Sequence, residues 1–121
     1  MIPPPTLSDD LKDIARLLAA WAAPAPGVTV YLFGSRVRGD HKPTSDVDIC
    51  IQWGKHLDQA DVNWHVFNEE EDYATIKRKL PGPLKILERN DPWWEHIIGA
   101  EVVHQDQNVR CVWLPPKPQQ G

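Results

Sequence analysis

One segment of the chain alternates strictly between polar and apolar residues, and it constrains the fold more than any other. A period of two, running from Asp46 to Trp53, matches a β-strand, in which successive side chains point to opposite faces. The face suited to a core consists of Val47, Ile49, Ile51 and Trp53. The other face carries Asp46, Asp48, Cys50 and Gln52. The alternation therefore predicts a strand with one face in a core and two carboxylates on the other.

The segments before and after this strand predict a sheet covered by helices. Residues 28–33 are β-branched and aromatic, as in a strand buried on both faces. Before them, a capping-box pattern at residues 6–9 opens a predicted helix that runs to about Ala22. The apolar stripe of this helix has helical spacing and consists of Leu7, Leu11, Ile14, Leu18 and Trp21. Between residues 58 and 80, apolar spacing predicts one or two further helices.

The C-terminal part of the chain predicts the remaining elements. They are a short strand at 84–87, a helix at 91–98, and a hairpin formed by 101–104 and 109–114. Asp91 as N-cap and Pro92 at the first helical position are typical of a helix start. We assign Trp93 and Trp94 to packing at the core and its edge rather than to stacking on a base.

This order of elements predicts an α/β (α+β) domain, with a mixed β-sheet flanked by helices in two or three layers. The chain has 121 residues, which is about one domain. We expect a single domain over residues 1–121, with loose tails at 1–5 and 115–121.

Composition excludes several classes of protein. Two cysteines cannot build a disulfide framework or a Cys-rich metal site. No apolar stretch approaches the ~20 residues of a membrane span, and the N-terminus lacks a signal-peptide core. The net charge of −4 argues against broad nucleic-acid binding, which needs a large positive field. We expect a cytoplasmic protein without a membrane partner, in which a nucleotide held at one local site remains compatible with the charge.

The loop between the two first strands has the residues of a phosphate cradle. Gly34 follows the strand directly and permits a tight turn with close approach of a ligand to the backbone. Ser35 adds a hydroxyl, and the residues after it can open a short helix whose N–H groups bind phosphate. Positive charge is supplied nearby by Arg36, Arg38, His41 and Lys42.

Asp46 and Asp48 have the spacing of a cation platform. Two residues apart on a strand, their Cβ atoms lie about 7 Å from each other on one face. At an effective dielectric constant of about 20, the two carboxylates repel by about 2 kcal/mol. A divalent cation would remove this repulsion and find oxygen ligands of the right hardness. A Mg-nucleotide needs both this platform and the cradle.

Each piece has an ordinary structural explanation when taken alone. A Gly-Ser after a strand is usually only a turn, and an Asp-x-Asp is more often a solvated polar face. Two other motifs do not match the sequence. A P-loop is excluded because Asp40 and His41 stand where it needs Lys and Ser or Thr. An EF-hand loop fails because Cys50 and Ile51 interrupt the oxygen ligands after Asp48. The two pieces together, in this order along the chain, indicate a nucleotide site far more specifically than either piece alone.

The segment from Gly34 to Ile49 resembles the signature of the DNA-polymerase-beta-like nucleotidyltransferase superfamily, G-S-x-x-x-G followed by S-D-[ILV]-D-[ILV]. It is most similar to the small stand-alone branch, the minimal nucleotidyltransferases. The resemblance implies transfer of a nucleoside monophosphate from a nucleoside triphosphate to an acceptor, with release of pyrophosphate. It implies that Gly34 and Ser35 hold the terminal phosphates, with Arg36 beside them. It also implies that Asp46 and Asp48 are catalytic and bind Mg²⁺, as one ion or two.

The chain departs from this family pattern at one position. The family carries a third carboxylate in a later strand, and residues 84–87 match that strand, which places Lys85 where the carboxylate is expected. A lysine there would repel the metal or pair with an aspartate. Glu88 is the nearest acid, but a shift of three residues would aim it at the opposite face.

Two functions therefore remain open at the level of the sequence. The first is an active nucleotidyltransferase. The second is a catalytically weak or inactive module that binds a nucleotide or a protein partner. Because minimal nucleotidyltransferases are often paired with a small helical HEPN-type protein, the resemblance makes one half of a toxin–antitoxin pair a candidate role.

Overall fold

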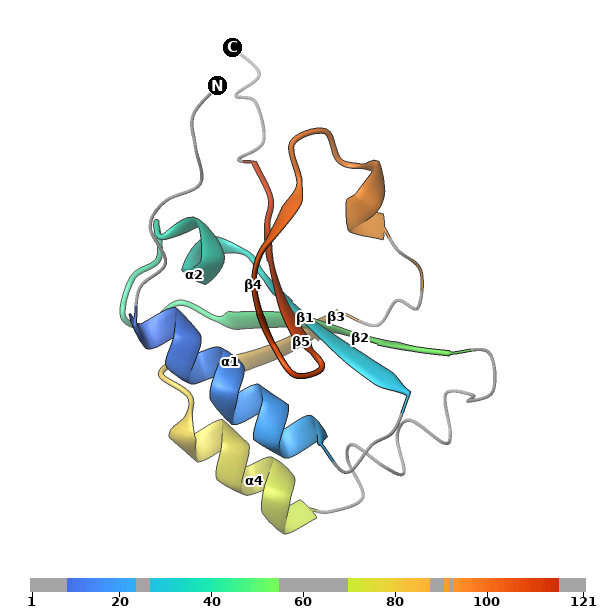
Figure 1. Cartoon of the computed structure of the whole chain (residues 1–121). Helices are drawn as coiled ribbons and strands as arrows, with labels where there is room; N and C mark the ends of the chain where they lie inside the picture. Colours follow the sequence, from blue (N-terminus) through green and yellow to red (C-terminus); the bar gives the residue numbers. More distant parts are fainter. Residues whose placement is uncertain (1–8, 24–26, 55–69, 88–90, 92, 116–121) are drawn as a thin grey trace.

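A five-stranded mixed sheet, with strand order β3-β2-β1-β5-β4, forms the framework of the computed structural model (Figure 1). The structure describes residues 9–23, 27–54, 70–87, 91 and 93–115. The strands are β1 (Val28–Phe33), β2 (Val47–Trp53), β3 (Leu84–Leu87), β4 (Glu101–Asp106) and β5 (Val109–Trp113). The helices are α1 (Asp9–Ala22), α2 (Ser35–Arg38), α4 (Glu70–Lys79) and the 3₁₀ helix η1 (Trp93–His96).

The sheet combines parallel and antiparallel pairs, as the sequence predicts. β1 runs antiparallel to β2 and parallel to β5, whereas β2 runs parallel to β3. β4 and β5 form the predicted antiparallel hairpin, which turns at Gln107 with a φ of 52° and contains a bulge between Val102 and His104. The α+β class with a mixed sheet is therefore confirmed.

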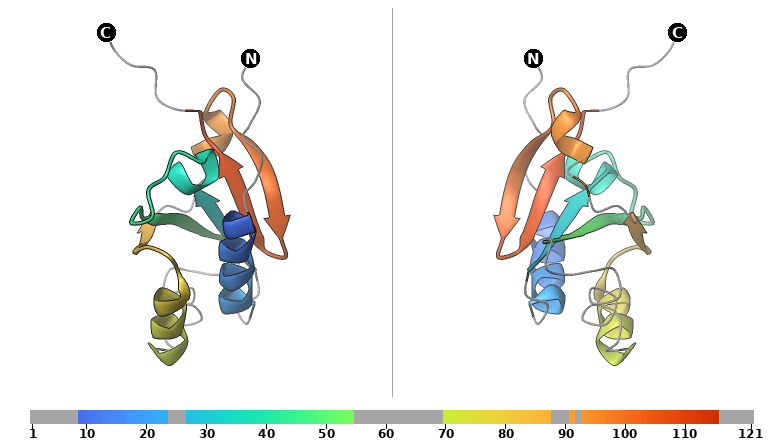
Figure 2. Two further views of the ribbon diagram at one scale, coloured as in Figure 1. Left: turned by 90° about the vertical axis from the view of Figure 1, so that its left-hand side faces the viewer. Right: turned by 90° about the vertical axis from the view of Figure 1, so that its right-hand side faces the viewer.

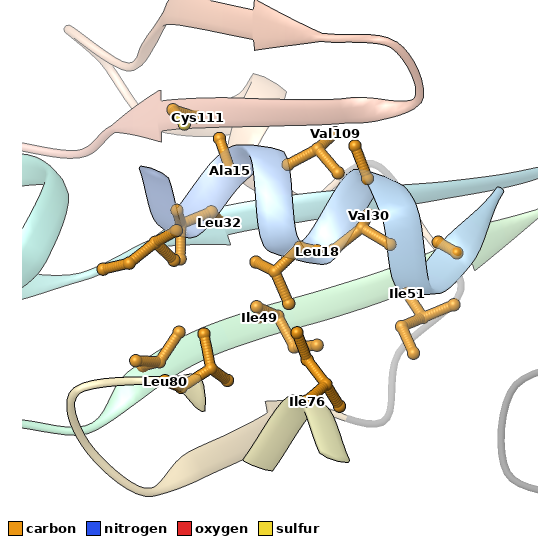
Figure 3. Packing of buried hydrophobic residues seen from close by; sticks show 14 of the residues in the cluster. Ala15, Leu18, Val30, Leu32, Ile49, Ile51, Ile76, Leu80, Val109 and Cys111 are labelled. Atoms are coloured by element: carbon orange, nitrogen blue, oxygen red, sulfur yellow. The ribbon is translucent and has the colours of Figure 1, made fainter. Parts of the chain in front are cut away.

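Helices α1 and α4 lie side by side and cover one face of the sheet (Figures 1 and 2). Within the described part of the apolar stripe of α1, Leu11, Ile14 and Leu18 are buried and Trp21 is partly buried, and the predicted apolar face of β2 packs toward them. Figure 3 shows this core, in which Leu18 of α1 lies among side chains of β1, β2 and α4. Leu18, Val30, Leu32 and Ile49 are fully buried. The alternation in β2 thus fixes which face of the sheet the helices cover.

A smaller apolar cluster lies on the opposite face of the sheet. Tyr31 and Cys50, which are register partners, are buried there together with Val112. Trp94 packs against Tyr31, with ring centroids 5.7 Å apart, and Trp93 meets Phe33 edge-on at 5.1 Å. The assignment of both tryptophans to packing is confirmed, and η1 partly covers the face that carries the aspartates.

The helix predicted at 91–98 is wrong in length and type. Among the described residues of this segment, Trp93–His96 alone is helical, and it is a 3₁₀ helix. The two tryptophans are held against the sheet, and Gly99, with a φ of 89°, turns the chain toward β4. Ile98, expected on an apolar helix face, is 95% exposed. Packing of the aromatic pair on the sheet therefore outweighs the propensity of this segment for a longer helix.

Some predictions fall outside the described residues. The capping box at residues 6–9 lies there except for Asp9, with which α1 begins. Residues 55–69, where part of the second helical region was expected, also lie outside, and α4 is the part of that region that the structure describes. The same holds for the tails, apart from Pro115.

Candidate active site

The register of β1 with β2 and of β2 with β3 assembles the candidate site. Phe33, the last residue of β1, pairs with Asp48, and Asp48 pairs on its other side with Lys85 of β3. Asp46 lies just before β2 and is exposed, whereas Asp48 is half-buried. Because side chains paired across strands share a face, the Asp48 carboxylate and the Lys85 ammonium lie on the same side of the sheet.

Gly34 brings the backbone of the β1–α2 turn directly against Asp48. Its φ is 87° and its ψ is −159°, a conformation that is essentially restricted to glycine. A Cβ atom added to Gly34 would collide with Oδ2 of Asp48. The turn that was expected to cradle phosphate therefore touches the carboxylate that was expected to hold the metal. The structure brings the two parts of the predicted site together.

The start of α2 carries the backbone donors of the predicted cradle. The N–H groups of Val37 and Arg38 both donate to the Gly34 carbonyl, at 3.1 Å each. The preceding N–H groups, those of Ser35 and Arg36, come too early in the helix to have an intrahelical acceptor. Such N–H groups at a helix start are suited to bind an anion. The half-buried Ser35 adds its hydroxyl beside them.

Arg36 supports the loop that leads into β2. The side chain is only 5% exposed. Its Nε donates to the Ser45 carbonyl at 3.2 Å, and its Nη2 donates to the carbonyls of Pro43 at 3.1 Å and Ser45 at 2.8 Å. These bonds hold the residue that immediately precedes Asp46. The binding of nucleotide by Arg36 stays a prediction, but the contacts seen here are with the chain itself.

The segment before β3 packs against the same loop. A Cβ on Gly82 would collide with the Ser45 carbonyl and would lie 3.0 Å from Nη2 of Arg36. The N–H of Val47 donates to the Pro83 carbonyl at 2.7 Å, at the start of the β2–β3 pairing. Arg36 is therefore the centre of a contact that sets the positions of both β2 and β3. The spacing of residues in the sequence contained no signal for this role.

Asp48 lies in an environment that disfavours its ionised form. Burial is the main cause that raises the pKa of its carboxyl group, and the negative charge of Asp46 raises it further. Lys85 and then Arg38 act in the opposite direction. A cation bound between the two aspartates would lower the pKa of Asp48, so protonation of Asp48 on acidification would compete with cation binding.

The donor set at this position fits one divalent cation. Asp46 and Asp48 supply carboxylate oxygens, and Mg²⁺ is commonly held by one or two carboxylates together with substrate phosphates and water. Within the part of the chain that the structure describes, no group of three or more His, Cys, Asp or Glu side chains could hold a metal ion. Within the described ranges, Asp46 and Asp48 are thus the acidic ligands that this site offers.

A pocket of about 270 Å³ opens beside Asp48, and no sequence pattern predicts it. Its lining consists of Phe33, Asp48, Lys85, Ile86 and Leu87. Three of these residues are apolar, and Lys85 contributes the single positive charge. The signal that could have located the pocket is the pairing of residues 47–50 with 84–87, which the alternating pattern of one strand does not specify by itself.

Comparison with known protein families identifies the chain. The nucleotidyltransferase domain family matches residues 14–97, a span that includes the β1–α2 turn, both aspartates and β3. The chain belongs to this family. It is a minimal nucleotidyltransferase of the DNA-polymerase-beta-like superfamily, and its general activity is nucleotidyl transfer. Searches of curated proteins and of solved structures gave no match. Among the described residues of this nucleotidyltransferase, no helix has the length and apolarity needed to cross a bilayer.

Replacing Gly34 with alanine tests the contact between the turn and Asp48. Gly34→Ala should cost about 1–3 kcal/mol of stability from backbone strain and should also displace the Asp48 carboxylate. We expect the variant to lose Mg²⁺-dependent binding of ATP, measured by calorimetry, while urea unfolding shows that it remains folded.

Gly99→Ala is the matched control for this change. Gly99 has a φ of 89°, close to the 87° of Gly34, but a Cβ there would meet only Pro115, at 3.5 Å. It should lose stability through the same kind of strain and keep ATP binding. Equal loss of binding in both variants would contradict a specific role for the contact with Asp48.

Replacing Arg36 with lysine tests the support of the β2 loop. Lysine keeps the charge but cannot donate to Pro43 and Ser45 from a planar group. Arg36→Lys should lower the free energy of unfolding by about 2–3 kcal/mol. Arg38→Lys, which alters the exposed pair with Asp40, should cost less than about 1 kcal/mol. Similar small losses in both variants, measured by urea denaturation, would show that the buried hydrogen bonds contribute little.

Proposed function

We propose that this nucleotidyltransferase transfers a nucleoside monophosphate from a Mg²⁺-bound nucleoside triphosphate to an acceptor and releases pyrophosphate. The observation that carries the proposal is the contact of the Gly34 turn with the Asp48 carboxylate. This contact supports the proposal, because phosphate oxygens bound by the turn would lie next to a cation held by Asp48, and a Mg-nucleotide requires the two together.

Each site residue has a defined task in the proposed reaction. The N–H groups at the start of α2 and the Ser35 hydroxyl bind the terminal phosphates, and Gly34 lets them approach Asp48. Asp46 and Asp48 hold Mg²⁺, which neutralises charge on the phosphates when it is bound. The remaining work is positioning, because phosphoryl-type transfer asks little covalent chemistry of the protein.

Lys85 favours a second candidate function. Its ammonium lies next to Asp48 in the register of the sheet, where the family pattern has a carboxylate. A positive charge there opposes a second Mg²⁺ ion. The alternative is therefore a catalytically weak or inactive module that binds a nucleotide or a partner, such as one half of a toxin–antitoxin pair with a HEPN-type protein.

Removal of both carboxylate charges tests the cation platform. Asp46→Asn combined with Asp48→Asn should abolish Mg²⁺-dependent ATP binding, because amide oxygens carry no charge to hold the ion. Stability should be unchanged or higher, since the mutual repulsion disappears. Asp13→Asn with Glu95→Gln removes the same charge from exposed positions and should leave binding intact. A double variant of the site that binds Mg-ATP like the parent would place the cation elsewhere.

A substitution at Lys85 separates the two candidate functions. Lys85→Asp restores a carboxylate beside Asp48 and removes the opposing charge, so the variant should bind divalent ions more tightly. If the parent is the weak or inactive module, the variant should also release pyrophosphate faster than the parent. Ion titration and turnover of parent and variant, side by side, give the answer. If the parent is active and Lys85→Asp is slower, Lys85 has a positive task in transfer and the inactive module is excluded.

A further inference from the structure

We propose that the acceptor of this nucleotidyltransferase carries an already ionised oxygen, a carboxylate or a phosphate, which Lys85 binds in the pocket beside Asp48. The inference rests on the proposed function and names the class of acceptor. Its basis is the position of the Lys85 ammonium in a pocket whose other charged group, Asp48, is engaged by Mg²⁺ in the proposed function.

The geometry of displacement assigns this pocket to the acceptor. Attacking and leaving oxygens lie roughly in line across the phosphorus atom in phosphoryl transfer. The terminal phosphates, which leave as pyrophosphate, are bound by the turn that follows β1, on one side of Asp48. The opposite side of Asp48 is occupied by β3, with Lys85 as its neighbour in the sheet. An acceptor that approaches opposite to the leaving group therefore comes from the side of Lys85.

The charge in the pocket favours an anion over a neutral hydroxyl. Among the described residues no carboxylate forms an ion pair with Lys85, so its ammonium can bind a ligand. Among the residues that line the pocket, Asp48 is the one group that could accept a proton, and in the proposed function its carboxylate is engaged by Mg²⁺. A hydroxyl would need such a base or a second metal ion to lose its proton. A carboxylate, with a pKa near 4, and a phosphate ester are ionised at neutral pH without help.

The pocket walls indicate the rest of the acceptor. The apolar side chains of Phe33 and Leu87 line the space next to Lys85, whereas the Ile86 side chain packs into the core on the other face of the sheet. With Asp48 engaged by Mg²⁺ in the proposed function, Lys85 and these apolar walls are suited to an organic anion that has an apolar body. The acceptor class is therefore a carboxylate or a phosphate monoester attached to a hydrophobic group.

The reaction balances without a proton transfer. The ionised acceptor oxygen attacks the α-phosphorus of the triphosphate and forms a new P–O bond. The bond from that phosphorus to the bridging oxygen of the β-phosphate breaks, and its electron pair leaves with pyrophosphate. A carboxylate gives a mixed anhydride, and a phosphate monoester gives a diphosphate.

Three probes with the same ring test the inference: benzoate, phenyl phosphate and benzyl alcohol. Their binding to the full chain with Mg²⁺ and ATP is measured by ligand NMR, and pyrophosphate release is followed in parallel. At least one anion should bind about ten-fold more tightly than benzyl alcohol and release pyrophosphate. Comparison of benzoate with phenyl phosphate shows whether the site prefers a carboxylate or a phosphate.

Lys85→Met tests whether the Lys85 ammonium causes the tighter binding of the anions. This variant keeps a side chain of similar length, and it should lose the ten-fold preference for the anion while benzyl alcohol binds as before. Lys79→Met, an exposed lysine of α4, should behave like the parent. An unchanged preference in Lys85→Met, or an anion that binds without pyrophosphate release, would overturn the inference.

A separate measurement of ATP binding distinguishes a failure of the acceptor class from a failure of the proposed function. Intact Mg-ATP binding together with anions that bind no better than benzyl alcohol would overturn the acceptor class and leave the proposed function standing. A parent chain that does not bind Mg-ATP would overturn the proposed function and, with it, this inference.

Discussion

The antiparallel pairing of β1 with β2 is the constraint on which the site depends. It places the end of β1 beside the start of β2, so that Phe33 pairs with Asp48 and Gly34 turns directly over the carboxylate. A slip of one residue would turn Asp48 toward α1 and α4 and would expose Ile49, which is fully buried. Burial of the apolar face therefore enforces the register, and the register positions the polar site.

A second set of contacts positions β3 beside the site. The guanidinium of Arg36 donates hydrogen bonds to backbone carbonyls of the loop before β2. Gly82, in the segment before β3, packs against the Ser45 carbonyl and against Arg36 itself. The parallel pairing of β2 with β3 then places Lys85 next to Asp48. The β3 side of the site thus depends on the buried Arg36, which bonds to the chain itself, and carries the exposed Lys85, to which we assign the binding of the acceptor.

Much of this arrangement could be predicted from local sequence patterns. The alternation at 46–53 identified the strand and its two faces, and the Gly34 turn was recognisable because a glycine directly follows an apolar strand. The family resemblance matched residues 84–87 to the strand of the third carboxylate, but their pairing with β2 was not predicted, since no local pattern specifies which strands are neighbours. The burial of Arg36 and the pocket beside Phe33 depend on contacts between segments distant in sequence. The 3₁₀ form of residues 93–96 depends on such contacts as well. Spacing along one segment does not encode these contacts.

The central claim is that Asp46 and Asp48 hold the ion that fixes a triphosphate against the Gly34 turn. Manganese binding, followed by NMR of the ¹⁵N-labelled chain with a non-hydrolysable ATP analogue, tests it most directly, because Mn²⁺ broadens the signals of nearby amides. The account predicts that the amides of Ser35, Asp46 and Asp48 broaden first, while that of Glu101 on β4 persists. Broadening centred on Glu101, or spread evenly over the acidic residues, would contradict it.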